Sequence, residues 1–133
     1  MEFTHVLFCI HDAKRNIVTG RFGFGKDMDE IIPRFRYPIT GDDDVFTKSI
    51  RKGKDYIILD VDSREYKNNI PEWIRKLTSP RSVVLYPLVL KKRCIGLIYA
   101  DTDGTTTSIS TEALGFFKTL RNQACLAVQK KSV

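Results

Sequence analysis

The sequence predicts an α+β fold, in which a central antiparallel sheet of five or six strands carries helices on its faces. Two apolar runs, Ser82–Leu90 and 95–103, flank a short basic turn, which is the pattern of a β-hairpin. Both runs are too apolar for a sheet that is wetted on one face, so other elements must cover it. The segment 111–130 follows with helical periodicity and supplies one such cover.

Two strands open the chain. Residues 5–12 alternate, so that Val6, Phe8 and Ile10 share one face of the first predicted strand. After a turn, residues 17–24 predict the second strand. Glycines at positions 20, 23 and 25 indicate a β-bulge or the close approach of another backbone.

The middle of the chain predicts short elements. Residues 27–32 can form a short helix, because acidic residues stabilise the first helical turn. Residues 34–37 lie between two prolines and are expected to be extended or irregular. Residues 56–61 form a strongly apolar predicted strand, followed by a polar loop.

Capping residues predict two further helices. Asp44 can cap a helix over 45–51, and Gly53 can end it. Pro71 stands at the first position of a helix that runs through Trp73 to Leu77, because a proline there loses no helical hydrogen bond. The last helix repeats apolar residues at helical spacing, and these are Ala113, Phe117, Leu120, Ala124 and Val128.

Composition excludes several classes of protein. A chain of 133 residues fits one domain, 1–133, and its basic residues, which give a net charge of +6, are scattered among acidic ones. This pattern indicates a solvated surface rather than a nucleic-acid footprint. The longest apolar run, Ser82–Leu90, is far shorter than the ~20 residues of a transmembrane helix, so no membrane contact is expected. Three unpaired cysteines and the absence of a signal peptide indicate a cytoplasmic protein.

Two motifs point weakly to other chemistry. The spacing from Gly20 to Gly25-Lys26 approaches a phosphate-binding loop, but Asp27 replaces the hydroxyl residue that would bind Mg²⁺. His5, Cys9 and His11 share a strand face, yet His5 lies about 13 Å from Cys9 along a strand, too far for one metal ion. We therefore predict neither a nucleotide hydrolase nor a metal site, and no cofactor.

The chain resembles GAF domains, the small-molecule sensors of bacterial signalling proteins, including those found beside HDOD domains. The resemblance rests on Arg21-Phe22-Gly23-Phe24-Gly25, on 56–60, on Leu85-Tyr86-Pro87-Leu88, and on 95–101 with the helix that follows. It implies a pocket walled by the middle helices and loops, a homodimer formed through terminal helices, and an attached output domain in a longer protein.

Within that resemblance, a small-molecule site needs an apolar cavity with a few convergent polar groups. The candidate ligand-binding residues combine these properties, and they are Arg36, Tyr37, Trp73, Tyr86, Tyr99 and Asp101. For each aromatic residue taken singly, a place in the core is the simpler interpretation.

Two alternatives to a ligand sensor remain open. Some GAF proteins, the free methionine sulfoxide reductases, use pocket cysteines, and Cys94 follows three basic residues that favour a thiolate. Nothing in the spacing places Cys94 or Cys125 beside Cys9. The other alternative is a scaffold of the same fold that has lost its ligand and serves only in protein–protein contact.

Overall fold

The computed structural model describes residues 3–40, 43–104 and 109–131 and confirms the predicted α+β class. Six strands and four helices lie within these residues. In chain order the elements are β1 (His5–Asp12), β2 (Ile17–Gly25), α1 (Met28–Arg34), β3 (Arg36–Pro38), α2 (Val45–Lys52), β4 (Tyr56–Ile58), α3 (Glu72–Thr78), β5 (Ser82–Leu90), β6 (Arg93–Thr102) and α4 (Thr111–Lys131).

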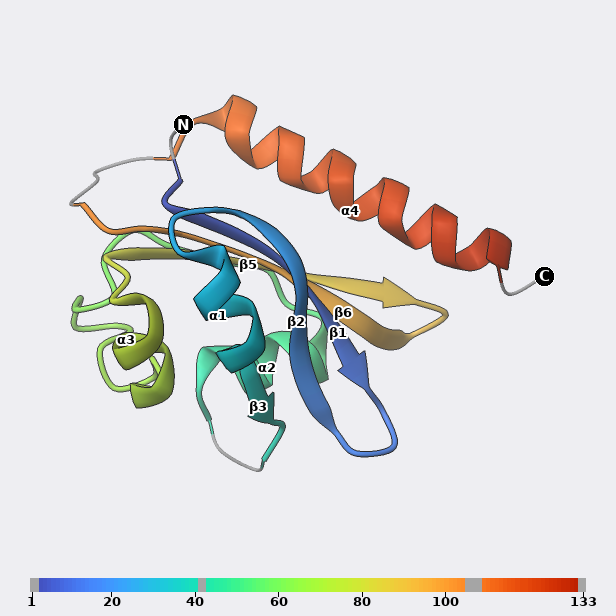
Figure 1. Ribbon diagram of the computed structural model, residues 1–133, viewed down its shortest axis with the longest axis horizontal. Helices are drawn as coiled ribbons and strands as arrows, with labels where there is room; N and C mark the ends of the chain where they lie inside the picture. Colours follow the sequence, from blue (N-terminus) through green and yellow to red (C-terminus); the bar gives the residue numbers. More distant parts are fainter. Residues whose placement is uncertain (1–2, 41–42, 105–108, 132–133) are drawn as a thin grey trace.

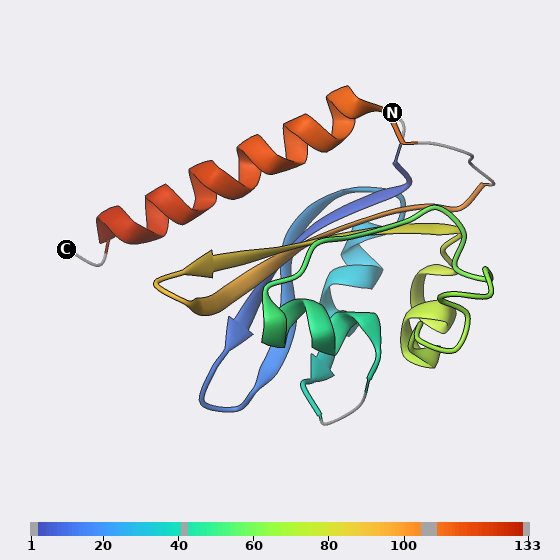
Figure 2. The ribbon, with the colours of Figure 1, turned by 180° about the vertical axis from the view of Figure 1, so that it is seen from behind.

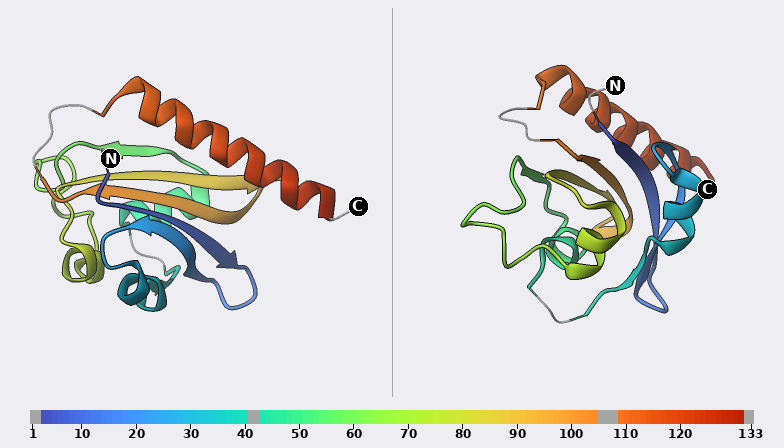
Figure 3. Two further views of the ribbon diagram at one scale, coloured as in Figure 1. Left: turned by 45° about the horizontal axis from the view of Figure 1, so that its top comes forward. Right: turned by 60° about the vertical axis from the view of Figure 1, so that its left-hand side comes forward.

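The strands form one antiparallel sheet with the order β3-β2-β1-β6-β5-β4. Helix α4 lies on one side of this sheet, and the short helices α1, α2 and α3 lie on the other (Figures 1 and 2). The sheet curls strongly, and α2 and α3 sit within the curl (Figure 3). The predicted helical covers are therefore present on both faces.

The sheet divides the apolar core into two layers. The larger layer lies between the sheet and α1–α3, and among its fully buried side chains are Leu7, Phe35, Phe46, Ile74 and Tyr99. The smaller layer lies under α4 and contains Val84, Tyr86, Ile98 and Phe117. Because β5 and β6 are central strands covered on both faces, their continuous apolar character has a direct structural reason.

The hairpin between β5 and β6 turns through two lysines. Lys91 and Lys92 have φ values of 51° and 66°, both in the left-handed region that two-residue hairpin turns require. The same strand pair has a register shift between Leu88 and Val89, just before the turn. The hairpin that the sequence predicted is thus confirmed, with a bulge that the apolar pattern did not show.

Glycines let α1 pack directly on the backbone of β2. A Cβ atom at Gly20 would lie 3.2 Å from the Ile32 carbonyl oxygen and 3.2 Å from the Phe35 Cβ, and one at Gly23 would clash with the Val6 carbonyl oxygen. A bulge between Phe8 and Cys9 accompanies this contact. The close approach predicted for these glycines is confirmed, and because β2 continues through Gly25, no phosphate-binding loop forms there.

Caps fix α2 and α3 where the sequence predicted them. The Asp44 carboxylate accepts a hydrogen bond from the Thr47 N–H at 2.9 Å, and Gly53 ends α2 with a φ of 63°. Pro71 occupies the N-cap of α3 rather than its first helical position, so the helix begins one residue later than predicted. The starts of the two helices lie close together, because the Val45 N–H of α2 donates a hydrogen bond at 3.0 Å to the Asn69 carbonyl, just before α3.

Two boundaries differ from the sequence prediction. Of residues 34–37, expected to be extended or irregular, Arg34 instead ends helix α1. Residues 36–38 form the extended edge strand β3, whose partners are 17–19 of β2. A proline is tolerated there because an edge strand has one unpaired side. Strand β4 ends at Ile58 rather than at residue 61, because the Asp60 carboxylate accepts a hydrogen bond from the Asp62 N–H and turns the chain.

Candidate functional site

The six predicted ligand-binding residues fall in four places in the structure. Tyr37 and Trp73 lie together at the edge of the larger core, and Tyr99 and Asp101 belong to a buried polar network beside it. Arg36 and Tyr86 lie apart from both regions. The structure thus brings four of the six residues to the face of the sheet that α1–α3 cover.

An aromatic pair connects β3 with α3. The rings of Tyr37 and Trp73 stack with their centroids 4.7 Å apart and their planes inclined by 25°. Phe35 and Phe46 meet Trp73 edge to face, at 5.3 Å and 5.4 Å between centroids. These rings fill the centre of the curled sheet, so that Trp73, which is half-buried, separates the packed core from the surface.

A cavity of about 410 Å³ opens beside this aromatic pair. It lies between the chain that leaves β3, the start of α2 and the start of α3. The residues that line it are Tyr37, Pro38, Thr40, Asp43, Asp44, Asn68, Asn69, Pro71, Glu72 and Trp73. We call it the Trp73 cavity. Its volume is within the range of small-molecule sites. Its lining combines two aromatic rings and two prolines with six polar or acidic residues.

A buried polar network joins α3 to the ends of β6 and β1. The Thr78 and Tyr99 hydroxyl groups lie 3.0 Å apart, and the Tyr99 hydroxyl donates a hydrogen bond to the Asp101 carboxylate. The other oxygen of Asp101 lies 2.8 Å from Nδ1 of His5. All four side chains are buried, so each group depends on its neighbours for its hydrogen bonds.

The network shifts the protonation of His5 and Tyr99. Burial alone would lower the pKa of His5, but the hydrogen bond and charge of Asp101, with the more distant Asp103, leave that pKa above its ordinary value. Burial and the neighbouring carboxylate raise the pKa of Tyr99 well above its usual range. The network therefore favours an imidazolium–carboxylate pair with a neutral phenol beside it.

A second cavity, of about 290 Å³, lies over this network. Its lining mixes Lys26 and Arg34 with Asp27, Glu30 and Asp103, besides His5 and the end of α3. Charges of both signs are exposed there, so the cavity has no clear preference for an anion or a cation.

Arg36 and Tyr86 do not line the Trp73 cavity. Arg36 is exposed and points away from Tyr37, since neighbouring residues of a strand face opposite sides. Tyr86 lies under α4, where its ring packs edge to face with Phe117 and beneath the Arg121 guanidinium, 4.9 Å from the ring centroid. Tyr86 is therefore separated from Tyr99 by the sheet itself.

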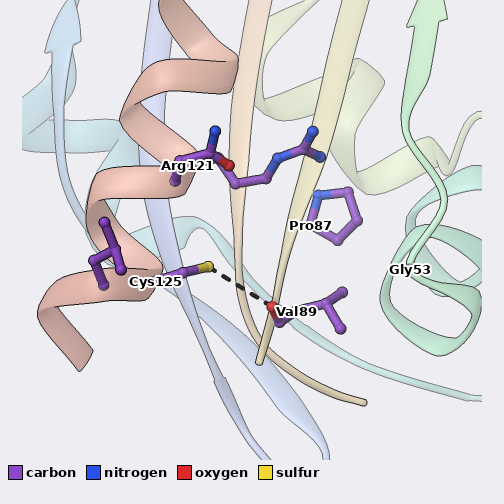
Figure 4. Close-up of a pocket in the computed structure, with 7 residues that line it drawn as sticks. Gly53, Pro87, Val89, Arg121 and Cys125 are labelled. Atoms are coloured by element: carbon purple, nitrogen blue, oxygen red, sulfur yellow. Dashed lines mark hydrogen bonds between the residues drawn. The ribbon is translucent and has the colours of Figure 1, made fainter. Parts of the chain in front are cut away.

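A third cavity, of about 480 Å³, lies between α4 and the outer edge of β5 (Figure 4). Gly53, Pro87 and Val89 wall one side of it, and Arg121 and Cys125 reach it from α4. The Arg121 guanidinium is already paired with the Asp55 carboxylate, and the Cys125 thiol points to the Val89 carbonyl oxygen at 3.8 Å. Both of these polar groups are thus engaged by the protein.

The three cysteines are free thiols in different settings. Cys9 is fully buried in the larger core, and burial raises the pKa of its thiol well above the ordinary value. Burial also raises the pKa of Cys94, whereas Cys125 packs on the other side of the sheet. Raised pKa values oppose the thiolate that nucleophilic or redox chemistry needs.

The described residues contain no cluster of three His, Cys, Asp or Glu side chains that could hold a metal ion. His11, one of the residues considered for such a site, instead lies 2.9 Å from the Cys94 carbonyl oxygen and 2.9 Å from the Asn16 side-chain oxygen. No helix within the described part of the chain is both long and apolar enough to cross a membrane.

Sequence reasoning missed several residues of these regions. His5 was considered only for a metal site and expected to be partly exposed, yet it is 4% exposed and pairs with Asp101. Asp43 and Glu72 of the Trp73 cavity were not singled out. One available signal was the acidic run before α2, whose members cannot all be needed to cap one helix.

The architecture of the chain defines its class of protein. One long helix covers one face of a curled antiparallel sheet of six strands, and short helices and loops cover the other face. No protein-family model matches the sequence, and no curated protein matches it either. Solved structures do match it along nearly its whole length.

Three of these structures illustrate the range of functions. A segment of a methyl-accepting chemotaxis protein, residues 122 to 287, has a TM-score of 0.80 at 20% identity, over 96% of this chain and 79% of that one. The GAF domain/HD domain protein from Geobacter sulfurreducens has a TM-score of 0.76 at 16% identity, over 100% and 85%. The free methionine-R-sulfoxide reductase from Neisseria meningitidis, solved with its substrate, has a TM-score of 0.70 at 20% identity, over 98% and 71%.

The chain therefore has the GAF fold, as its sequence resemblance implied. Signalling sensor domains and free methionine-R-sulfoxide reductases share this fold. At identities of 20% or less the likeness concerns the fold alone, so the function must be argued from the residues of this chain.

Proposed function

We propose that this chain is a non-enzymatic regulatory module that binds a small molecule in the Trp73 cavity. The observation that carries this proposal is the half-buried Trp73, which stacks on Tyr37 and forms the wall of a 410 Å³ cavity. Trp73 lines the cavity with the part of its large apolar ring that is not buried, while its aromatic contacts hold it in place. The occurrence of the fold in signalling sensors supports the same function.

The thiols argue against a reductase. Chemistry of that kind needs a thiolate and a second thiol within reach. Here burial raises the pKa of both Cys9 and Cys94, and Cys125 lies across the sheet from Cys9. Cys125 is near enough to Cys94 to act on it, but it raises the pKa of Cys94 and so opposes its thiolate. The combination favours a binding function over an enzymatic one.

The buried polar network offers a physical link between the cavity and the rest of the domain. Trp73 and Thr78 belong to the same short helix, so a ligand that moves α3 also moves the Thr78 hydroxyl group. That group contacts Tyr99, and Asp101 beyond it pairs with His5 of β1. A displacement of α3 would thus reach the strand that precedes α4.

The side of the sheet beneath α4 supports a role for a second copy of the chain. Phe22 and Phe24 of β2 are each 55% exposed, and Phe116 of α4 is 60% exposed. Phe24 and Phe116 border the same groove beside α4. Exposed apolar patches of this kind mark interaction surfaces, and we assign this one to homodimerisation within a longer signalling protein.

Thermal unfolding tests the binding function. A panel of anionic, neutral and cationic metabolites is expected to contain compounds that raise Tm by several degrees, because a ligand at 100 times its Kd stabilises the folded state by about 2.7 kcal/mol. Trp73→Leu should abolish this rise. A panel without effect on Tm or on Trp73 fluorescence would favour the ligand-free scaffold instead.

Substitution of the two partly exposed thiols, Cys94 and Cys125, tests the enzymatic alternative. The wild-type protein is expected to show no turnover of free methionine sulfoxide, and Cys94→Ser and Cys125→Ser should leave the ligand-induced rise in Tm unchanged. Turnover by the wild type that either substitution abolishes would make the protein a reductase. The assay is coupled NADPH consumption with a thiol-reducing system.

A further inference from the structure

The charge of the Trp73 cavity is opposite to that of the whole chain. The chain has a net charge of +6, yet three carboxylates line the cavity, from Asp43, Asp44 and Glu72. Among the described residues, no Lys, Arg or His lines it. From this reversal we infer that the Trp73 cavity binds an organic cation, such as a quaternary ammonium compound. The inference rests on the proposed function and names the class of ligand.

Two of the three carboxylates are available for a ligand. Asp44 is engaged in capping α2, where it accepts hydrogen bonds from both the backbone N–H and the hydroxyl group of Thr47. Asp43 and Glu72 are exposed, and neither has an ion-pair partner in the part of the chain that the structure describes. Their charges therefore act on the cavity without an ion-pair partner from residues 3–40, 43–104 or 109–131.

Trp73 provides the second feature that a cation site needs. The face of an indole ring attracts cations more strongly than that of the other aromatic residues, and the attraction grows when the cation loses water. Stacking on Tyr37 and edge-to-face contacts with Phe35 and Phe46 fix the ring in its place. A ring held in this way binds without a further loss of side-chain freedom.

The same residues do not fit a bare metal ion. A metal site needs at least three donors that converge within a small sphere, and no such cluster occurs among the described residues. An organic cation is larger, and it can contact an aromatic face on one side and carboxylates several ångströms away on the other. The cavity of about 410 Å³ has room for such a molecule.

Fluorescence of Trp73 gives a direct test, because it is the only tryptophan of the chain. The probe is choline, and the control is its neutral isostere 3,3-dimethyl-1-butanol, in which a carbon atom replaces the charged nitrogen. Choline is expected to change the emission of Trp73 with a Kd of about 1 mM or tighter. The neutral isostere should bind at least roughly tenfold more weakly, and added salt should weaken choline alone.

Charge-neutral variants identify the carboxylates. The double variant Asp43→Asn, Glu72→Gln keeps the size of both side chains and should weaken choline binding roughly tenfold. Asp29→Asn is the matched control, because Asp29 is also an exposed acid in the first turn of a short helix and does not line the cavity. It should leave the Kd unchanged.

The outcomes separate the two proposals, with the anion AMP as a third probe. Equal binding of choline and its neutral isostere, or binding of AMP in preference to choline, would overturn the cation inference and leave the binding function in place. Binding of choline that is indifferent to Asp43→Asn, Glu72→Gln would also overturn it. Failure of all three probes together with the full metabolite panel would overturn the cation inference and the proposed function alike.

Discussion

Phe117→Asp is expected to lower the free energy of unfolding by about 4 kcal/mol or more, whereas Phe116→Asp should change it by less than about 1 kcal/mol. Phe117 is 2% exposed and meets Phe3 edge to face, with ring centroids 4.9 Å apart. Its replacement removes a buried ring and places a carboxylate in the apolar layer under α4, where the carboxylate loses its hydration and the nearby Arg121 guanidinium is already paired with Asp55. Denaturant unfolding of both variants measures the difference.

The neighbouring residue separates folding from assembly. Phe116 is 60% exposed, so its side chain contributes little to the stability of one copy of the chain. If the groove between α4 and β2 is the homodimer surface, Phe116→Asp should convert a dimer into a folded monomer, as measured by light scattering after size-exclusion chromatography. A dimer that persists in Phe116→Asp would contradict this use of the surface. Equal destabilisation by both substitutions would contradict the packing of α4.

The elements that the sequence predicted best are those that local pattern determines. The hairpin of β5 and β6, the caps of α2, and the helix of 111–131 each depend on residues close together in the chain. The apolar face predicted for this helix is confirmed for Ala113, Phe117, Leu120 and Ala124, while the side chain of Val128 lies outside the described residues.

The candidate site was predicted less well, because long-range pairing decides it. His5 meets Asp101, 96 positions away, only because β1 lies between β2 and β6. The side of the sheet on which Tyr86 lies depends on the hairpin register, and the shift between Leu88 and Val89 alters that register. A one-residue change of register moves a side chain to the other face of the sheet. The spacing of the sequence alone therefore could not show whether Tyr86 and Tyr99 lie on the same face.

The Trp73 cavity shows the same limit. The sequence placed Trp73 on a short helix and Tyr37 between two prolines, and it indicated both as ligand-binding residues. Their stacking follows from the pairing of β3 with the end of β2 that starts at Ile17, which no local pattern predicted. Their contact with a ligand stays a prediction, for Tyr99 and Asp101 as well.

Asp101→Asn is expected to lower the free energy of unfolding by about 3 kcal/mol at pH 6, because it breaks a buried charge pair and leaves His5 without its partner. The Tyr99 hydroxyl loses a carboxylate acceptor at the same time. Tyr99→Phe removes the hydroxyl group that bonds to Thr78 and Asp101 but leaves the His5–Asp101 pair in place, so it should cost less, about 1–2 kcal/mol. Chemical denaturation of both variants at pH 6 tests the order of the two effects.

The pH dependence of stability distinguishes a charged pair from a neutral hydrogen bond. The pKa of His5 is raised in the folded protein, so the folded state holds its proton more tightly than the unfolded state does. The resulting stabilisation is fully present below the unfolded value of about 6.5 and disappears as the pH rises through the higher folded value. Wild-type stability should therefore fall as the pH rises from 6 to 8, and Asp101→Asn should flatten this profile.

The other histidine of the chain provides the control for that profile. His11 contacts a backbone carbonyl and the Asn16 side chain rather than a carboxylate, so His11→Asn should keep the wild-type decline. If the decline survives Asp101→Asn but vanishes in His11→Asn, the titrating group is His11. That result would contradict the charged pair of His5 and Asp101. If His5 is instead the titrating group, the His5–Asp101 pair that links α3, β6 and β1 loses its charge as the pH rises through the raised pKa of His5. The affinity for a ligand at α3 should then change over the same pH range.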